Sequence, residues 1–133
     1  MAPTALVLNI ENRVGALASV AKILAEAGVN VAGLQLGRGP DQKNLRLVVD
    51  NPEVALAALA KRGFDAKRTE VLSVTVRNIP GAIAKAAERL AAHGVNIEAV
   101  FLSAKSTKRV EMILQVDDVA AARAALKSSD EEE

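Results

Sequence analysis

The chain repeats itself once along its length. Shifting the 133-residue sequence by 66 positions superposes residues 6–36 on residues 72–102 without a gap. The matches include Asn12, Gly15, Ala16, Ala18, Ala21, Leu24, Ala25, Gly28, Val29 and Asn30 on Asn78, Gly81, Ala82, Ala84, Ala87, Leu90, Ala91, Gly94, Val95 and Asn96. Beyond that stretch the offset becomes 67, and a loop accommodates the extra residue. The two halves of the chain should therefore share one fold.

Each copy begins with the same succession of patterns. Apolar residues alternate along residues 6–10 and 72–76, which is typical of a strand with one buried face. Apolar residues at helical spacing follow, and Gly28 and Gly94 are placed to end those helices, since glycine tolerates the left-handed conformation there. Second strands open at residues 29–31 and 95–97 and turn through residues 37–44 and 103–108 into third strands.

Each copy then continues into a second helix. Asp50-Asn51-Pro52 and Asp117-Asp118 predict N-caps for these helices. In the first copy Gly63 ends the helix and residues 64–69 supply a fourth strand, whereas the second copy lacks one. We predict an α+β fold of two ferredoxin-like βαββαβ units, at residues 1–70 and 71–127, followed by an acidic disordered tail at 128–133. Each unit has an antiparallel sheet with both helices on one face, and we expect the two to join side by side in one extended sheet.

Composition excludes several function classes. A net charge of +1 and only two aromatic residues, Phe64 and Phe101, argue against nucleic-acid binding. The sequence has no long apolar run that would suggest a membrane span, and it has no cysteine that would suggest an oxidising compartment. We therefore expect a cytoplasmic protein. The single histidine, His93, falls in a predicted last helical turn. We therefore expect no enzyme activity, no catalytic residue, no metal site and no cofactor. The glycines of Gly37-Arg38-Gly39-Pro40 join two strands, which indicates a flexible hairpin rather than a phosphate loop.

The loop motifs resemble those of the ACT domain. In the first copy they are Glu11-Asn12-Arg13-Val14-Gly15-Ala16-Leu17 and Gly28-Val29-Asn30-Val31; in the second they are Asn78-Ile79-Pro80-Gly81-Ala82-Ile83 and Gly94-Val95-Asn96-Ile97. The resemblance implies a small-molecule sensor, usually of amino acids, that pairs side by side into an eight-stranded sheet with ligands at the seam. The motifs look closest to the serine-sensing ACT domain of 3-phosphoglycerate dehydrogenase, whose matching asparagines hold the ligand.

The sequence departs from that pattern at several positions. Ile10 and Val76 stand where the serine-sensing domain has a histidine. Val14 replaces the usual proline, which Pro80 keeps in the second copy. Since the second copy also lacks its fourth strand, we expect the two sites to be unequal.

The candidate residues suit a zwitterionic ligand. An asparagine amide offers donors and an acceptor, and the turn at Gly15 or Gly81 opens a helix whose free N–H groups attract a carboxylate. The predicted ligand-binding residues are Asn12, Arg13, Val14, Gly15, Ala16, Leu17, Asn30, Val31, Asn78, Ile79, Pro80, Gly81, Ala82, Ile83, Asn96 and Ile97.

Each of these residues also has a purely structural interpretation. Asn12 and Asn78 could be N-caps or turn residues, and Asn30 and Asn96 could satisfy local backbone. If they bind ligand, Asn30 and Asn96 reach the cleft of their own copy or that of a neighbouring copy. Gly15 and Gly81 could serve the turn alone, and Arg13 could be solvated.

We therefore predict a non-catalytic, allosteric module that regulates amino-acid metabolism by binding an amino acid between ACT units. The unpaired sheet edge of the second copy predicts a homodimer. The alternative is an interaction module that binds a partner enzyme or regulator and no small molecule.

Overall fold

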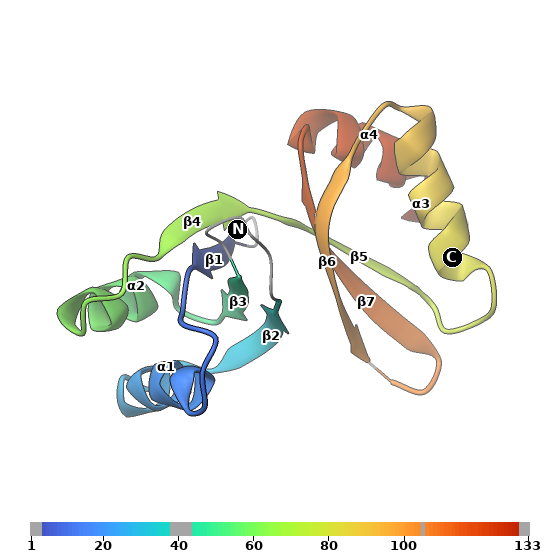
Figure 1. Ribbon diagram of the computed structural model, residues 1–133. Helices are drawn as coiled ribbons and strands as arrows, with labels where there is room; N and C mark the ends of the chain where they lie inside the picture. The colour runs from blue at the N-terminus through green and yellow to red at the C-terminus, as the bar shows by residue number, and fades with distance from the viewer. Residues whose placement is uncertain (1–3, 38–43, 105, 131–133) are drawn as a thin grey trace. The chain divides into compact units, whose positions relative to one another are not determined.

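The computed structural model describes residues 4–37, 44–104 and 106–130, which form two compact units (Figure 1). We call Thr4–Thr69 the first unit and the segment from Glu70 onward the second unit.

The first unit has four strands and two helices among its described residues. They are β1 (Thr4–Leu8), α1 (Ala16–Glu26), β2 (Val31–Leu36), β3 (Leu45–Val49), α2 (Pro52–Lys61) and β4 (Lys67–Glu70). The strands form one sheet in the order β2-β3-β1-β4, and β3 pairs antiparallel with both of its neighbours.

The core of the first unit lies between this sheet and its two helices (Figure 1). Leu6 pairs with Leu47 and Leu8 with Leu45, so these four side chains share the face toward the helices, and all are almost fully buried. The helices contribute their own buried stripes, including Val20 and Leu24 of α1 and Ala55 and Leu59 of α2. Burying one leucine contributes about 1.5–3 kcal/mol, which makes this face the main source of stability.

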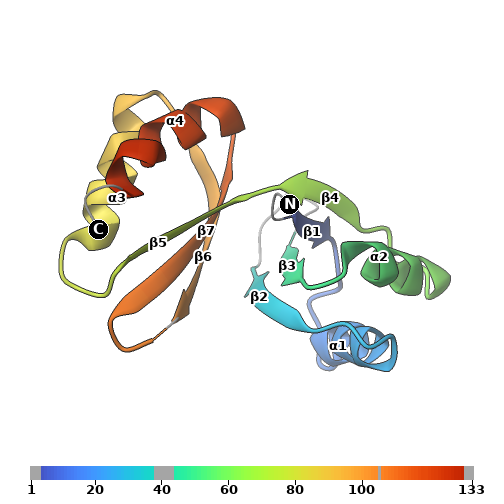
Figure 2. The ribbon, with the colours of Figure 1, turned by 180° about the vertical axis from the view of Figure 1, so that it is seen from behind.

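The second unit repeats this arrangement with one strand fewer. It consists of β5 (Leu72–Arg77), α3 (Ala82–Ala92), β6 (Ile97–Ala104), β7 (Arg109–Val116) and α4 (Val119–Asp130). The sheet order is β5-β7-β6, and α3 and α4 pack side by side on one face (Figure 2). The core includes Val74, Leu90, Met112 and Leu114.

The structure contains the capping residues from which the helix boundaries are predicted. Gly28 and Gly94 follow α1 and α3 with φ angles of +74° and +72°. The Asn51 side chain accepts a hydrogen bond from the Val54 N–H at 3.3 Å, and Asp118 accepts one from Ala121 at 3.0 Å. Both second helices therefore begin where the sequence predicts.

The prediction of two ferredoxin-like units is confirmed, with two differences. The described strands form two separate sheets rather than one extended sheet, because β4 hydrogen-bonds to β1 and β5 to β7, each within its own set of strands. Helix α4 runs to Asp130, so residues 128–130, expected in the tail, are helical. Within residues 106–130 the structure has no strand after β7. The predicted hairpin at residues 37–40 lies largely outside the described residues.

Candidate functional site

A cavity of about 550 Å³ opens in the first unit at the start of α1. We call it the loop cavity. Its walls are the segment between β1 and α1, the first turn of α1 and the two ends of the β2–β3 connection. The predicted residues that line it are Asn12, Arg13, Gly15, Ala16 and Leu17; Leu36, Gly37 and Asn44 face them. Of the first-copy predictions, Val14, Asn30 and Val31 do not line the loop cavity.

The segment before α1 folds as a tight turn that leaves backbone donors free. Gly15 is the N-cap of α1 with a φ of +86°, a conformation that explains why glycine stands there. The Ala16 N–H donates to the Arg13 carbonyl at 3.2 Å. The next N–H groups, of Leu17 and Ala18, belong to the first helical turn, have no backbone partner among the described residues, and border the cavity. Such groups favour an anionic ligand.

The Asn12 side chain has no structural partner within the described chain. Asn12 is exposed, and its amide makes no hydrogen bond there. The N-cap interpretation of Asn12 is wrong, because Gly15 is the N-cap and the helix has no side-chain cap. Its amide therefore borders the loop cavity with both its donor and acceptor functions available.

Arg13 is paired rather than simply solvated. Its Nε donates to Glu11 Oε2 at 2.9 Å, and Nη1 donates to the Val14 carbonyl at 3.3 Å. Glu11 also lines the cavity, so its rim carries one charge of each sign. Val14 is 99% exposed and points away from any packed surface of the unit.

Sequence reasoning missed Asn44, the buried polar residue of the described chain at 9% exposure. Its Oδ1 accepts a hydrogen bond from the Ile10 N–H at 2.8 Å, and its Nδ2 donates to the Ile10 carbonyl at 2.6 Å. The Asn44 carbonyl accepts from the Gly37 N–H at 2.8 Å. One side chain thus takes the place of a strand partner for Ile10 and holds together both walls of the loop cavity. The repeat carries a signal for Asn44, because the two copies differ there: the matching residue of the second copy is Glu111.

Asn30 and Val31 lie at the other end of α1 from Asn12. The helix has 11 residues, which at 1.5 Å per residue is about 16 Å. The Asn30 N–H donates to Asp50 Oδ1 at 3.0 Å, and its carbonyl accepts from the Asp50 N–H at 3.1 Å. Its backbone is therefore structural, and the idea that Asn30 reaches the cleft of its own copy is wrong, because one amino acid cannot span the helix. A binding role for Asn30 would require a neighbouring copy, whereas its backbone hydrogen bonds to Asp50 fit the structural interpretation.

The second copy places the matching residues differently. Asn78 donates from Nδ2 to the Thr107 carbonyl at 3.2 Å and from its backbone N–H to the Lys108 carbonyl at 2.8 Å. Strand pairing there continues to Arg77 and Arg109, where the first copy relies on Asn44. The structural interpretation thus applies to Asn78, and Asn12 lies in the bend before α1, as a turn residue does.

The remaining second-copy candidates surround α3. Gly81 is its N-cap with a φ of +90°, Ile79, Pro80 and Ile83 are exposed, and Ala82 is half-buried. Asn96 repeats the arrangement of Asn30, since its N–H donates to Asp117 Oδ1 at 2.9 Å. It is followed by Ile97, which packs against the core.

The described residues contain no group of three or more histidine, cysteine, aspartate or glutamate side chains that could hold a metal ion. Among the same residues no helix combines the length and apolar character that a membrane crossing requires.

The sequence matches a known protein family over almost its whole length. The family model described as ACT domain pair matches residues 1–129. The chain belongs to the ACT domain pair family. No curated protein matches this ACT domain pair.

Solved structures resemble the ACT domain pair over nearly its whole length. Protein BT0572 from Bacteroides thetaiotaomicron is 28% identical, with a TM-score of 0.87 over 98% of this chain and 90% of that one. The ligand-free regulatory subunit of aspartate kinase from Thermus thermophilus is 26% identical, with a TM-score of 0.72 over 98% and 91%. The same subunit from Thermus flavus is 25% identical, with a TM-score of 0.63 over 95% and 90%. Two of these three relatives are thus regulatory subunits.

Proposed function

We propose that this ACT domain pair is a non-catalytic, cytoplasmic regulatory module that binds an amino acid in the loop cavity. One observation carries the proposal: the exposed Asn12 amide and the N–H groups of Leu17 and Ala18 border the same cavity without partners in the described chain. Because a neutral amide and helix N–H groups complement a carboxylate beside an ammonium, this combination suits a zwitterion. The resemblance to aspartate kinase regulatory subunits supports a regulatory role.

We propose an orientation for the ligand from the residues that form the walls. Its carboxylate accepts from the first-turn N–H groups of α1, toward which the helix dipole draws negative charge. Its ammonium lies near the Asn12 carbonyl oxygen and the Glu11 carboxylate, which offer acceptors on the same rim. The side chain of the ligand extends toward Leu36. Serine is one candidate, from the sequence resemblance, and the departure at Ile10 leaves the choice of amino acid to experiment.

We also propose that two chains pair through the open side of the loop cavity. Strand β2 ends the order of its sheet, and Leu34 and Leu36 on it are 44% and 47% exposed. A second chain placed antiparallel along β2 would cover these leucines. It would also bring its own Asn30 toward Asn12, which the single unit cannot do.

The alternative is an interaction module that binds a partner enzyme and no small molecule. The second unit favours it in one respect, because Ile79, Ile83 and Leu102 are all 44% exposed or more. A protein partner could cover such side chains.

A melting screen separates these functions. A ligand of about seven heavy atoms can bind anywhere from roughly millimolar to submicromolar, so each amino acid must be tested to high millimolar concentration. At a hundred times Kd, binding adds about 2.7 kcal/mol and raises the Tm by several degrees. We expect Asn12→Ala to reduce this shift and the matched variant Asn78→Ala to leave it unchanged. If none of the twenty amino acids changes the Tm, the interaction module becomes the better proposal.

A further inference from the structure

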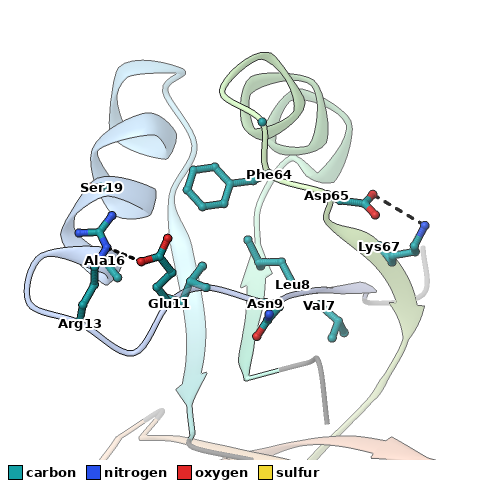
Figure 3. A pocket seen from close by; sticks show the side chains of 12 residues that line it. Val7, Leu8, Asn9, Glu11, Arg13, Ala16, Ser19, Phe64, Asp65 and Lys67 are labelled. Atoms are coloured by element: carbon teal, nitrogen blue, oxygen red, sulfur yellow. Dashed lines mark hydrogen bonds and ion pairs between the residues drawn. The ribbon is translucent and has the colours of Figure 1, made fainter. Parts of the chain in front are cut away.

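A second cavity of about 530 Å³ lies in the first unit, beside α1 and the segment that joins α2 to β4 (Figure 3). We call it the α2–β4 cavity. It shares the residues around Glu11 and Arg13 with the loop cavity, but its other wall is formed by Gly63, Phe64, Asp65 and Lys67. Leu36, Gly37 and Asn44 do not line it, so its opposite wall is entirely different from that of the loop cavity.

Two ion pairs stand on opposite sides of this cavity (Figure 3). Arg13 Nε lies 2.9 Å from Glu11 Oε2, and Lys67 Nζ lies 3.7 Å from Asp65 Oδ1. The four side chains are between 58% and 85% exposed. Ion pairs this exposed contribute little to stability, so their groups can turn to a ligand at small cost. The cavity therefore offers both signs of charge on each wall.

Apolar surface lies between the two pairs. The ring of half-buried Phe64 lies between α1 and α2, and the buried Leu8 side chain points from β1 toward it (Figure 3). Phe64 packs against the core of the first unit, and its N–H donates to the Leu59 carbonyl at 3.0 Å, which holds its backbone beside the end of α2. Ring and aliphatic surfaces of this kind contact apolar side chains and exclude water.

We propose that the α2–β4 cavity is a second binding site, for a free amino acid with an apolar side chain. Its carboxylate pairs with Lys67, its ammonium with Glu11 or Asp65, and its side chain contacts Phe64. The four charged side chains sum to zero, which favours a zwitterion over a phosphate or other polyanion. The volume is within the range of about 300–1,000 Å³ typical of small-molecule pockets. The site differs from the loop cavity in its second wall, and the two cavities share Glu11 and Arg13.

The wall formed by residues 63–67 belongs to the first unit, where it connects α2 to β4. The proposal places the site in this unit.

The experiment is an NMR titration of the full ¹⁵N-labelled chain with L-leucine and L-phenylalanine to high millimolar concentration. We expect saturable shifts at the amides of Gly63, Phe64 and Asp65 that persist in Asn12→Ala. Leucinamide, which lacks the carboxylate, and 4-methylpentanoate, which lacks the ammonium, should each bind at least tenfold more weakly than leucine.

A double variant tests the charged wall. Asp65→Asn with Lys67→Gln removes one charge of each sign from exposed positions, so the fold should be retained, and the apparent affinity should fall at least tenfold. The matched control is Lys61→Gln with Glu88→Gln, which removes the same charges outside the cavity and should leave the affinity unchanged.

Three results would overturn the second site. The first is saturable shifts confined to residues 12–17 and 36–37, which would leave the loop-cavity function standing. The second is shifts at residues 63–65 that never saturate. The third is equal loss of affinity in the control variant. Saturable shifts at residues 63–65 without any at residues 36–37, which line only the loop cavity, would instead retain the second site and reject the loop cavity.

Discussion

The buried side chain of Asn44 replaces strand pairing at the wall of the loop cavity. In an ordinary antiparallel pair, the end of β1 would bond to backbone on its neighbour. Here the amide of Asn44 supplies both the acceptor and the donor to Ile10, while the Asn44 carbonyl bonds to Gly37. The second copy keeps backbone pairing to Arg77 instead. The residue that frames the loop cavity is thus also a stabilising residue of the unit.

Asn44→Ala should destabilise the chain measurably. The substitution leaves the Ile10 N–H and carbonyl without partners in a buried place, and each unsatisfied buried group costs about 1–3 kcal/mol. We expect a loss of about 2 kcal/mol in the free energy of unfolding, measured by urea titration followed by circular dichroism. Asn30→Ala is the control, because that side chain is exposed and surface changes usually stay within about 0.5 kcal/mol. Equal stability of the two variants would contradict the role given to Asn44.

At the scale of elements, local pattern was sufficient to predict the fold. The alternation at Leu6 and Leu8, the glycine after α1 and the cap at Asn51 depend on neighbours within a few residues, so they could be read directly. The loop cavity could be predicted only in part. Asn12 and Asn78 occupy matching positions, yet the Asn78 side chain donates to the Thr107 carbonyl, whereas the Asn12 side chain has no hydrogen-bond partner among the described residues. Contacts between residues 29 or 34 positions apart are not encoded in a local pattern.

The α2–β4 cavity was missed for a related reason. Phe64, Asp65 and Lys67 have no matching residues in the repeat, so the duplication that drew attention to the loops gave them no signal. Their placement beside Arg13 follows from the return of β4 to the edge of β1, which is a property of the sheet.

The edge strand β2 carries the proposed pairing of chains. Leu36→Lys places a charge on an exposed leucine at this edge, and lysine on an edge strand opposes pairing with another strand. We expect size-exclusion chromatography with light scattering to show a dimer for the natural chain at micromolar concentration and a monomer for the variant. Val54→Lys is the control, since Val54 is 39% exposed on α2, away from this edge. A natural chain that is monomeric, or a dimer that survives Leu36→Lys, would contradict pairing through β2.

At the scale of the whole molecule, the two copies of the duplication differ in their loops. In the first unit the Asn12 amide has no hydrogen-bond partner among the described residues, Asn44 bonds to Ile10, and a fourth strand is present. In the second unit Asn78 is already bonded to Thr107, and exposed Ile79 and Ile83 flank its loop. A unit that binds no amino acid can still keep its fold and bind a partner protein through its surface. The two proposed functions, sensor and interaction module, are therefore compatible within one chain.

This division predicts that a bound amino acid protects one copy only. Exchange from the first turn of α1 requires release of the ligand, so at a hundred times Kd it should slow by up to about a hundredfold. Hydrogen exchange read by mass spectrometry should show this protection in peptides covering residues 10–18 and none in those covering 76–84. Asn12→Ala should remove the protection and Asn78→Ala should preserve it, because only the first of these amides faces a ligand. Equal protection of both segments would mean that the Asn78 bond to Thr107 opens on binding, and the two copies would then be equivalent sensors.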